Sequence, residues 1–595
     1  MNMKKIGFRA GVALAVVWAC TLVPAFAADL FFAGDSTLES CWVDARKREP
    51  YRSWGDSLQG RLKSGSKVRN FARSGYSTKM FIERGAWKSL IAEVKAGDFV
   101  VIQFGHNDQK HTTEEQVQTL YAPPDGAYRE NLRNFAAEVR AKGATPVFCT
   151  PIVRATFDDA GRKLVDTTWA KDGITLATYA QAVRETGAEL GVDVVDMNRL
   201  TGELCEKVGR DEAYRFFVIS TGLIRGKDGE PAKDVTHPIQ RGADAFADLF
   251  CKDVCARQLK VAELFAPVER AKAELPALLR QVKSTHDGTL QPCYFYAPEA
   301  AKAKAGPLIV GLHTWSYDWR DLGHYATVYA EAKRSGWAMV GPNFRGANDH
   351  PEACGSDAAV QDIVDAVRYA QSRTSIDPDR IYIIGGSGGG HMTLLMAGRH
   401  PEIWAGCAAF CPISDIARWH ADSSLTGHPG RELGYAKMLE KVCGGTPAEQ
   451  PDEYRRRSPL TWLSAARQAK VPVYIVTGIH DGWKGSVPVG HSFRAFNALA
   501  AESDRIGEPD IASIEDNQKV PDALAFGDAD DPFYGPNMRI HFRRTSDNVR
   551  MTLFEGGHGG NFPAGFDFLS RQVKGRPADF TLPADGRGQE ESLHR

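Results

Sequence analysis

Apolar residues in this chain occur in short runs that alternate with longer amphipathic stretches. From Asp29 to about Leu259, runs of strand length are separated by segments with helical spacing of apolar positions, such as Tyr128–Lys142 and Ile174–Gly187. This alternation predicts an α/β domain with a parallel sheet and helical crossovers. The predicted strands are Leu30–Ala33, Phe99–Phe104, Pro146–Thr150 and Val192–Val195.

A second alternation of the same kind begins near Thr285 and predicts a second α/β domain. It contains a strong helical pattern over Asp357–Ser372. The predicted strands are Leu308–Leu312, Ala338–Gly341, Ile381–Ile384, Val473–Thr477 and Arg550–Phe554. Between the two patterns, Lys260–Lys283 is rich in Ala, Leu and charge, and predicts a helical connector.

These patterns divide the chain into domains at 28–259 and 285–575, with the connector at 260–284. Residues Glu502–Phe533, rich in Asp, Pro, Gly and Ala, predict an inserted loop or subdomain. Residues 576–595 are polar with Pro and Gly, and predict a loose tail.

The first residues predict an export signal at 1–27. Lys4, Lys5 and Arg9 precede an apolar run, and Ala25-Phe26-Ala27 forms a cleavage site. The alternative is an N-terminal membrane anchor, but the run is shorter than the ~20 residues that span a bilayer. We expect a periplasmic or secreted enzyme with no membrane span.

Charge and cysteine content exclude several classes of partner. The 595 residues carry a formal net charge of -1, which gives no general attraction to nucleic acid. Cys251 and Cys255, like Cys407 and Cys411, lie four residues apart without the paired spacing of a zinc site. We expect no metal site, and mostly buried thiols with room for one or two disulfides.

A first candidate nucleophile follows the strand Leu30–Ala33. Ser36, in Gly34-Asp35-Ser36-Thr37, lies at the carboxyl end of a parallel strand, where such sheets bind ligands. Asn107, in Gly105-His106-Asn107-Asp108, follows another strand. A serine nucleophile needs a base and oxyanion donors. Downstream, Asp234 and His237 stand three residues apart, so one turn can hold both.

The alternative interpretation is a simple turn at Gly34-Asp35-Ser36, with Asp234 and His237 capping a helix. Four ordered blocks favour catalysis. Gly34-Asp35-Ser36, Gly75 within Asn70–Ser77, Gly105-His106-Asn107-Asp108 and Asp234-x-x-His237 resemble those of the SGNH (GDS) hydrolases. Thr37, and Gly242-Ala243 after His237, make the region similar to the rhamnogalacturonan acetylesterase branch.

This resemblance implies a flavodoxin-like three-layer domain with Ser36 as nucleophile, His237 as base and Asp234 as its partner. The N–H groups of Ser36 and Gly75, with the Asn107 side chain, are the implied oxyanion hole. We expect His106 to have a structural hydrogen-bonding role.

A second nucleophile motif follows Ile381–Ile384. Ser387 lies in Gly385-Gly386-Ser387-Gly388-Gly389-Gly390-His391, with a strand before it and a helical pattern after it, as G-x-S-x-G requires. Asp481 and His558 each follow a later predicted strand, in the order Ser, Asp, His expected of an α/β-hydrolase. His391 and His480 are alternative bases, and a degenerate domain retained for packing is an alternative function.

This region resembles the prolyl-oligopeptidase-like α/β-hydrolases over about Thr285–Gln572, through Asn343-Phe344-Arg345-Gly346, Asp377-Pro378-Asp379-Arg380 and Arg457-Ser458-Pro459. It departs from them in having no β-propeller ahead of the domain. Its oxyanion loop reads His313-Thr314-Trp315-Ser316 in place of His-Gly-Gly. The expected oxyanion donors are the N–H of Gly388 and one near Trp315.

The sequence therefore predicts a bifunctional carbohydrate esterase that removes acetyl groups at the first site and acetyl or methyl groups at the second. The expected substrate is an esterified plant polysaccharide or oligosaccharide, most simply pectin. Acyl-enzyme chemistry of this kind needs no cofactor. The alternatives are an esterase fused to a serine peptidase, or a binding protein with one inactive domain.

Overall fold

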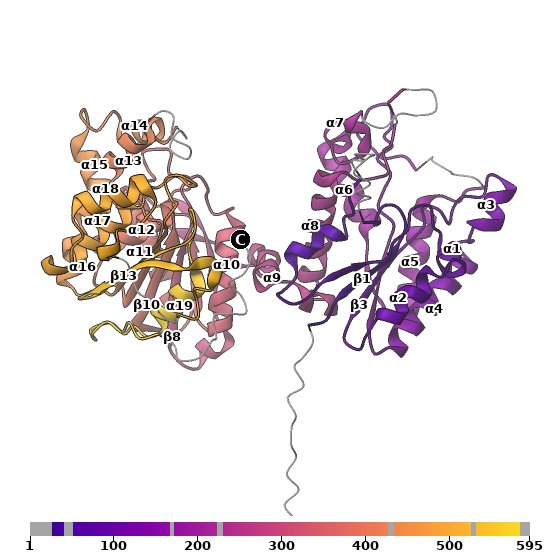
Figure 1. Cartoon of the computed structure of the whole chain (residues 1–595), viewed down its shortest axis with the longest axis horizontal. Helices are drawn as coiled ribbons and strands as arrows, with labels where there is room; N and C mark the ends of the chain where they lie inside the picture. Colours follow the sequence, from indigo (N-terminus) through magenta and orange to yellow (C-terminus); the bar gives the residue numbers. More distant parts are fainter. Residues whose placement is uncertain are drawn as a thin grey trace, which may run out of the picture.

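The computed structural model describes residues 27–40, 51–166, 172–222, 230–231, 233–425, 434–524 and 531–582. In these residues the first domain contains a parallel sheet of order β2-β1-β3-β4-β5 (Figure 1). This is the flavodoxin-like order, with β1 at the point where the chain reverses direction across the sheet. The strands are β1 Leu30–Gly34, β2 Val68–Asn70, β3 Phe99–Gln103, β4 Thr145–Cys149 and β5 Asp193–Val195.

Helices cover both faces of this sheet because its strands are apolar on both sides. On β3, Val100 and Ile102 pack against one set of helices, while Phe99 and Val101 pack against the other. The first set is α1 Thr78–Glu83, α2 Ala86–Glu93, α4 Ala127–Ala141 and α5 Leu176–Leu190, and the second includes α6 Met197–Val208 and α8 Gln240–Ala256. Two shorter helices are α3 Glu114–Thr119, which buries no residue, and α7 Arg210–Tyr214, which contributes Ala213 to the core on the α8 side.

The connector is helical over only part of its predicted length. It contains the helix α9 Pro267–Glu274, flanked by short 3₁₀ turns, but Leu279–Lys283 forms strand β6 of the second sheet. The prediction was wrong for these five residues because three of them are charged or polar, as in a charge-rich helix, and pairing with β7 selects the extended form. Helix α9 packs against α8 of the first domain and α10, Leu322–Ser335, of the second.

The second domain contains a mixed sheet of order β13-β14-β12-β11-β10-β8-β9-β7-β6 in the described part of the chain. Its inner strands run parallel, whereas β6, β7 and β13 pair antiparallel at the edges. The strands are β7 Leu290–Tyr296, β8 Gly306–Leu312, β9 Ala338–Pro342, β10 Ile376–Gly386, β11 Gly406–Phe410, β12 Val473–Gly478, β13 Ile540–Ser546 and β14 Val549–Phe554.

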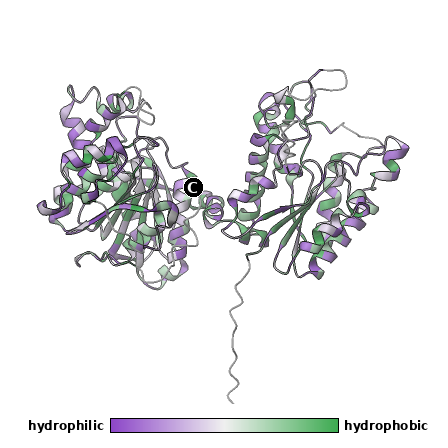
Figure 2. Ribbon diagram, viewed as in Figure 1, coloured by the Kyte–Doolittle hydropathy of each residue, from purple (hydrophilic) through white to green (hydrophobic). Residues whose placement is uncertain are grey.

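Helices also cover both faces of this sheet, and the apolar residues gather between the layers (Figure 2). Helices α10 and α19 Phe562–Ser570 cover one face. The other is covered by α11 Asp357–Arg373, α12 Gly388–Arg399, α16 Leu463–Gln468, α17 Gly490–Leu499 and α18 Glu508–Asn517. Helices α13 Ile416–Ser423, α14 Tyr435–Cys443 and α15 Pro451–Arg457 build a separate apolar cluster around Trp315.

The predicted insertion and the predicted loose tail both pack partly on the second domain. Within Glu502–Phe533, helix α18 buries Ile511 and Ile514 in the core. In the predicted tail, Phe580 stacks on Phe568 with ring centroids 5.4 Å apart. Residues 583–595 of the tail, and the export signal up to residue 26, lie outside the described residues.

The nine cysteines that the structure describes are all buried and free, so the one or two expected disulfides are absent among them. Of the helices in the described ranges, none combines the length and apolar character needed to cross a membrane.

Candidate active sites

The turn after β1 holds Ser36 at the carboxyl edge of the first sheet. The Asp35 carboxylate is buried and accepts hydrogen bonds from the Thr37 N–H at 3.0 Å and hydroxyl at 2.8 Å, while its other oxygen lies 3.2 Å from His106 Nδ1. Burial opposes its charge, yet His106 and Thr37 lower the pKa of Asp35. A buried ionic turn therefore fixes the half-buried Ser36 in place. His106 has the structural contact expected of it.

A continuous hydrogen-bonded chain joins Ser36, His237 and Asp234. His237 Nε2 lies 2.8 Å from Ser36 Oγ, and its Nδ1 lies 2.8 Å from Asp234 Oδ2. The other oxygen of Asp234 accepts the N–H groups of Thr236 and His237, at 2.9 and 3.0 Å. One turn thus holds acid and base together. Asp234 keeps a lowered pKa despite burial because His237 and these N–H groups favour its charged form.

Asn107 and Gly75 lie beside this chain. Asn107 Nδ2 donates to the carbonyl of Tyr76 at 3.0 Å, which ties the amide to the turn containing Gly75. Gly75 has φ of +79°, a left-handed conformation that favours glycine. Lys110 Nζ donates to Asn107 Oδ1 at 2.7 Å. Because Oδ1 faces an ammonium group, the orientation of the amide is fixed and its second N–H is left for another acceptor.

Ser387 lies in a strained turn between β10 and α12. Its backbone has φ of 57° and ψ of -117°, and its N–H donates to the carbonyl of Phe410 at 2.8 Å. The turn requires glycine, since a Cβ at Gly385 would lie 2.6 Å from the carbonyl carbon of Gly389. This is the geometry of a nucleophile elbow, which exposes a serine at the end of a strand.

His558 is paired with Asp481 in the second domain. Its Nδ1 lies 3.0 and 2.9 Å from the two carboxylate oxygens, and Asp481 also accepts the N–H groups of Gly482 and Val487. Across the described residues, no hydrogen bond joins His558 to Ser387. In the second site the His558–Asp481 pair is therefore formed, but Ser387 is not hydrogen-bonded to it. Catalytic hydrogen bonds of this kind are often long without substrate and shorten when substrate binds.

The two alternative histidines have other partners. His391 is fully buried, with Nε2 2.8 Å from the carbonyl of Arg457, and burial lowers its pKa to about 4. His480 Nε2 lies 2.8 Å from Glu555. The geometry thus favours His558 as the base.

The backbone of Trp315 lies against the elbow. A Cβ added to Gly388 would lie only 2.6 Å from Trp315 N. The two predicted oxyanion donors, the N–H of Gly388 and one near Trp315, therefore lie close together. The indole ring does not line an open acyl pocket, because it is 2% exposed and packs edge-on against Trp419 with centroids 4.6 Å apart.

Comparison with known proteins agrees with the two sites. Residues 32–244 match the GDSL-like Lipase/Acylhydrolase family. This region is 32% identical over 225 residues to rhamnogalacturonan acetylesterase RhgT of Bacillus subtilis, covering 38% of this chain and 88% of that protein. The chain belongs to the GDSL-like lipase/acylhydrolase family. Its GDSL-like domain is also 28% identical over 225 residues to the probable rhamnogalacturonan acetylesterase YesY of the same organism, covering 38% of this chain and 91% of YesY.

The second domain is prolyl-oligopeptidase-like. Residues 324–511 match the prolyl oligopeptidase family. The domain is 29% identical over 161 residues to the uncharacterized peptidase YtmA of Bacillus subtilis, covering 27% of this chain and 56% of YtmA. Both domains are therefore serine hydrolases by family.

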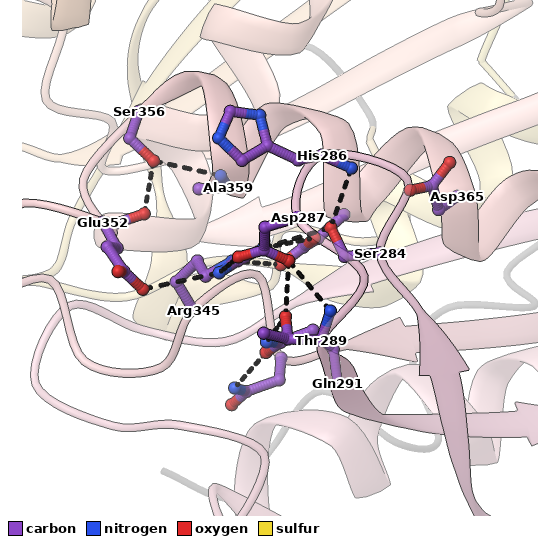
Figure 3. Close-up of polar contacts among 12 residues, drawn as sticks. Ser284, His286, Asp287, Thr289, Gln291, Arg345, Glu352, Ser356, Ala359 and Asp365 are labelled. Carbon is purple, nitrogen blue, oxygen red and sulfur yellow. Dashed lines mark hydrogen bonds and ion pairs between the residues drawn. The ribbon is translucent and has the colours of Figure 1, made fainter.

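Arg345 is the centre of a buried polar network in the prolyl-oligopeptidase-like domain (Figure 3). Its side chain is 3% exposed and bonds to Asp362 at 2.7 Å, Asp287 at 2.6 Å and Ser284 at 3.1 Å, with Glu352 at 3.4 Å. These partners come from α11, from the turn between β6 and β7, and from the loop that follows Arg345. Arg345 itself has φ of 79°, so the network holds a strained backbone.

This network supports the oxyanion loop. Phe344, next to Arg345, stacks on His313 with centroids 3.8 Å apart, and His313 Nε2 lies 2.8 Å from the carbonyl of Asn343. Three residues beyond Arg345, the N–H of Asn348 donates to the carbonyl of Trp315 at 2.9 Å. The loop that Arg345 fixes therefore contacts His313 and Trp315.

Arg345→Met is expected to slow the second site by roughly tenfold or more, because an oxyanion donor shifted from its place loses part of its effect. The measurement is the rate at which a fluorophosphonate labels Ser387, with labelling of Ser36 unchanged. Removing one partner of a buried ion pair can cost about 3–5 kcal/mol, so Arg345→Lys, which keeps the charge, is the milder variant. Arg571→Met removes an ion pair within α19 and is the control. An unchanged rate in a folded Arg345→Met variant contradicts this role.

The second site is expected to gain activity as pH rises. Burial disfavours the charged ring of His558, yet its pKa is raised well above the usual range, chiefly because the Asp481 carboxylate lies beside it. A general base acts in its neutral form, so the site is inactive below the raised pKa and active above it. The labelling rate of Ser387 should still be rising well above pH ~6.5, where an ordinary histidine is half neutral. A rate that is level above that pH contradicts the prediction.

Sequence reasoning missed several site residues. Lys110 and Arg154 lie beside the Asn107 block, Arg345 beneath the oxyanion loop, and Cys411 beside His558. The contact of Lys110 with Asn107 could have been predicted from the sequence, because a spacing of three residues places both side chains in one turn. The others reach their sites from distant segments, and no spacing in the sequence signals them.

Proposed function

We propose that the protein is an exported esterase with two active sites, whose GDSL-like domain removes acetyl groups from pectic polysaccharide, specifically rhamnogalacturonan. The observation that carries this proposal is the Ser36–His237–Asp234 chain in a domain similar to rhamnogalacturonan acetylesterase RhgT. Export rests on the leader pattern at 1–27.

The geometry suits acyl transfer at Ser36. Ser36 Oγ attacks the acetyl carbonyl while His237 Nε2 takes its proton, and Asp234 stabilises the charged ring. The N–H groups of Ser36 and Gly75, with Asn107 Nδ2, stabilise the oxyanion. The sugar hydroxyl leaves with the proton from His237, and water then releases acetate by the same steps in reverse.

A buried cation beside this site favours an acidic substrate. Arg154 is 8% exposed, and its Nη2 lies 3.4 Å from the carbonyl of His106. Its Nη1 has no hydrogen-bond partner, and no carboxylate of the described residues forms an ion pair with it. Burial lowers the pKa of Arg154 to about 10, although Asp166 and Asp35 favour its charge without bonding to it, so a further carboxylate would stabilise the guanidinium. A polymer that carries uronic acid groups supplies carboxylates, whereas a neutral polysaccharide does not.

The Ser387→Ala variant isolates the first site for a test. Acetate release from acetylated rhamnogalacturonan should exceed release from acetylated xylan, a neutral polymer, at matched acetyl content. The double variant Ser36→Ala/Ser387→Ala is the control for uncatalysed release. Equal rates on both polymers would limit the assignment to a general acetylesterase, and no acetate from either would reject it.

For the second site we propose cleavage of another ester on the same polysaccharide, either acetyl or methyl. The elbow at Ser387 and the His558–Asp481 pair supply nucleophile and base for either ester. A second candidate is peptide hydrolysis, which the match of residues 324–511 to the prolyl oligopeptidase family favours.

The Ser36→Ala variant separates these candidates. We expect methanol from methyl-esterified pectin or acetate from acetylated pectin, with little release from chromogenic peptide amides. Ser36→Ala/Ser387→Ala is again the control. Rapid release from the amides without either pectin product would replace the esterase assignment by a peptidase.

A further inference from the structure

A thiol lies beside the acid–base pair of the second site. Cys411 directly follows β11 with φ of 44° and is 2% exposed. Its Sγ, a carboxylate oxygen of Asp481 and a ring nitrogen of His558 all lie within 4.8 Å of one another. Acyl transfer at Ser387 makes no use of this thiol, so its position calls for another explanation.

Cys411 and Asp481 are held in place by separate parts of the fold. Cys411 Sγ lies 3.0 Å from the carbonyl of Gly559, and the Cys411 N–H donates to Val476 at the end of β12. Asp481 accepts two backbone N–H groups, as described above. The cluster is thus preorganised, as a binding site needs to be.

We propose that Zn²⁺ binds to Cys411, Asp481 and His558 and thereby switches off the second site. Thiolate, imidazole and carboxylate are the three ligand types that Zn²⁺ takes in proteins, and three of them with one water complete a tetrahedral shell. Binding replaces the thiol proton, which passes to solvent, by a Zn–S bond. The side chain of His558 is 25% exposed, which gives the ion a path to the cluster.

Inhibition follows from the shared ligands. A metal on His558 Nε2 occupies the lone pair that would accept the proton of Ser387, whereas a metal on Nδ1 leaves the ring proton on Nε2, which then cannot accept another. Asp481 bound to the metal also no longer orients that ring. Among the described residues, Cys411, Asp481 and His558 are the one group of potential metal ligands found, so the first site has no such group. Zn²⁺ should therefore distinguish the two sites of one chain.

The test measures fluorophosphonate labelling of Ser387 in the Ser36→Ala full-length chain, which requires no knowledge of the natural substrate. Zn²⁺ should slow labelling, whereas Mg²⁺, which prefers oxygen ligands, should not. Loss of a residue that only supports a metal ligand costs about 10–100-fold in metal affinity. Cys411 is itself a proposed ligand, so Cys411→Ser should raise the half-inhibiting Zn²⁺ concentration at least about tenfold. Each variant is compared with its own zinc-free rate.

A second readout does not depend on activity. Co²⁺ added to the Ser36→Ala/Ser387→Ala chain should give a thiolate-to-cobalt absorption band, and Cys411→Ser in that background should remove it. Cys411→Ala serves where serine disturbs the fold. Equal zinc sensitivity with and without Cys411, equal inhibition of labelling at Ser36 in the Ser387→Ala chain, or a cobalt band that survives loss of Cys411 would each overturn the proposal.

Discussion

Ser36→Ala should lower acetate release by the GDSL-like domain by about 10⁶-fold, the scale seen when a triad serine is removed. The reason is geometric, since Ser36 Oγ lies 2.8 Å from His237 Nε2 and no other hydroxyl of the described residues bonds to that nitrogen. Without the oxygen, His237 has no nucleophile to activate. The measurement is acetate released from acetylated rhamnogalacturonan in a chain that also carries Ser387→Ala.

Two comparisons make this result specific. Asn107→Ala keeps the nucleophile but removes an oxyanion donor, so it should lower kcat by only about 10²–10³-fold. In a separate chain that keeps Ser387, the rate of Ser387 labelling should be the same with Ser36 and with Ser36→Ala. A Ser36→Ala enzyme that releases acetate within tenfold of the parent rate would mean that another residue is the nucleophile.

His558→Ala is expected to lower the rate of the second site by about 10⁴–10⁶-fold, since a triad acts as a unit and loss of its base disables the serine. His558 is paired with both oxygens of Asp481, whereas His480 binds Glu555 and His391 a backbone carbonyl. The rate of Ser387 labelling in the Ser36→Ala background is the measurement.

The matched control is His480→Ala, which removes the histidine adjacent to Asp481 in sequence. It should change the labelling rate less than about threefold, because the His480 ring binds Gln518 and Glu555 and contacts neither Ser387 nor the Asp481 carboxylate by a hydrogen bond among the described residues. If His480→Ala is the slower variant, the base has been assigned to the wrong ring. The labelling rate of Asp481→Asn should lie between those of His558→Ala and His480→Ala. In that variant the His558 ring keeps a hydrogen-bond partner but loses the carboxylate that stabilises its charged form.

Sequence patterns could locate both nucleophiles because each follows a buried parallel strand. Strand ends are readable from apolar runs, and β1 pairs with β3 so that Gly34 lies opposite Gln103. This register alone brings the turn of Ser36 to the block of Asn107. The short spacing of Asp234 and His237 made their contact predictable as well.

The features that the sequence did not predict depend on three-dimensional packing. Strand β6 was predicted as helix because three of its five residues are charged or polar, and only pairing with β7 selects the extended form. Arg345 and Cys411 act through partners more than fifty residues away, such as Asp287 and Asp481. No periodicity encodes such contacts, and a loop residue is assigned a partner only when the fold is known.

Helix α9 belongs to both domains at once. Glu274 at its end binds Tyr329 at 2.7 Å and Lys333 of α10, while Ala266 just before it donates its N–H to Arg61 of the first domain at 3.0 Å. The junction is therefore a packed helix and not a free hinge. These contacts on both sides of α9 restrain the movement of Ser36 relative to Ser387. Under the function proposed above, a polysaccharide chain bound at one serine would present to the other only those ester groups that lie at a matching contour distance. The spacing of substituents along the polymer would then become part of what the enzyme recognises.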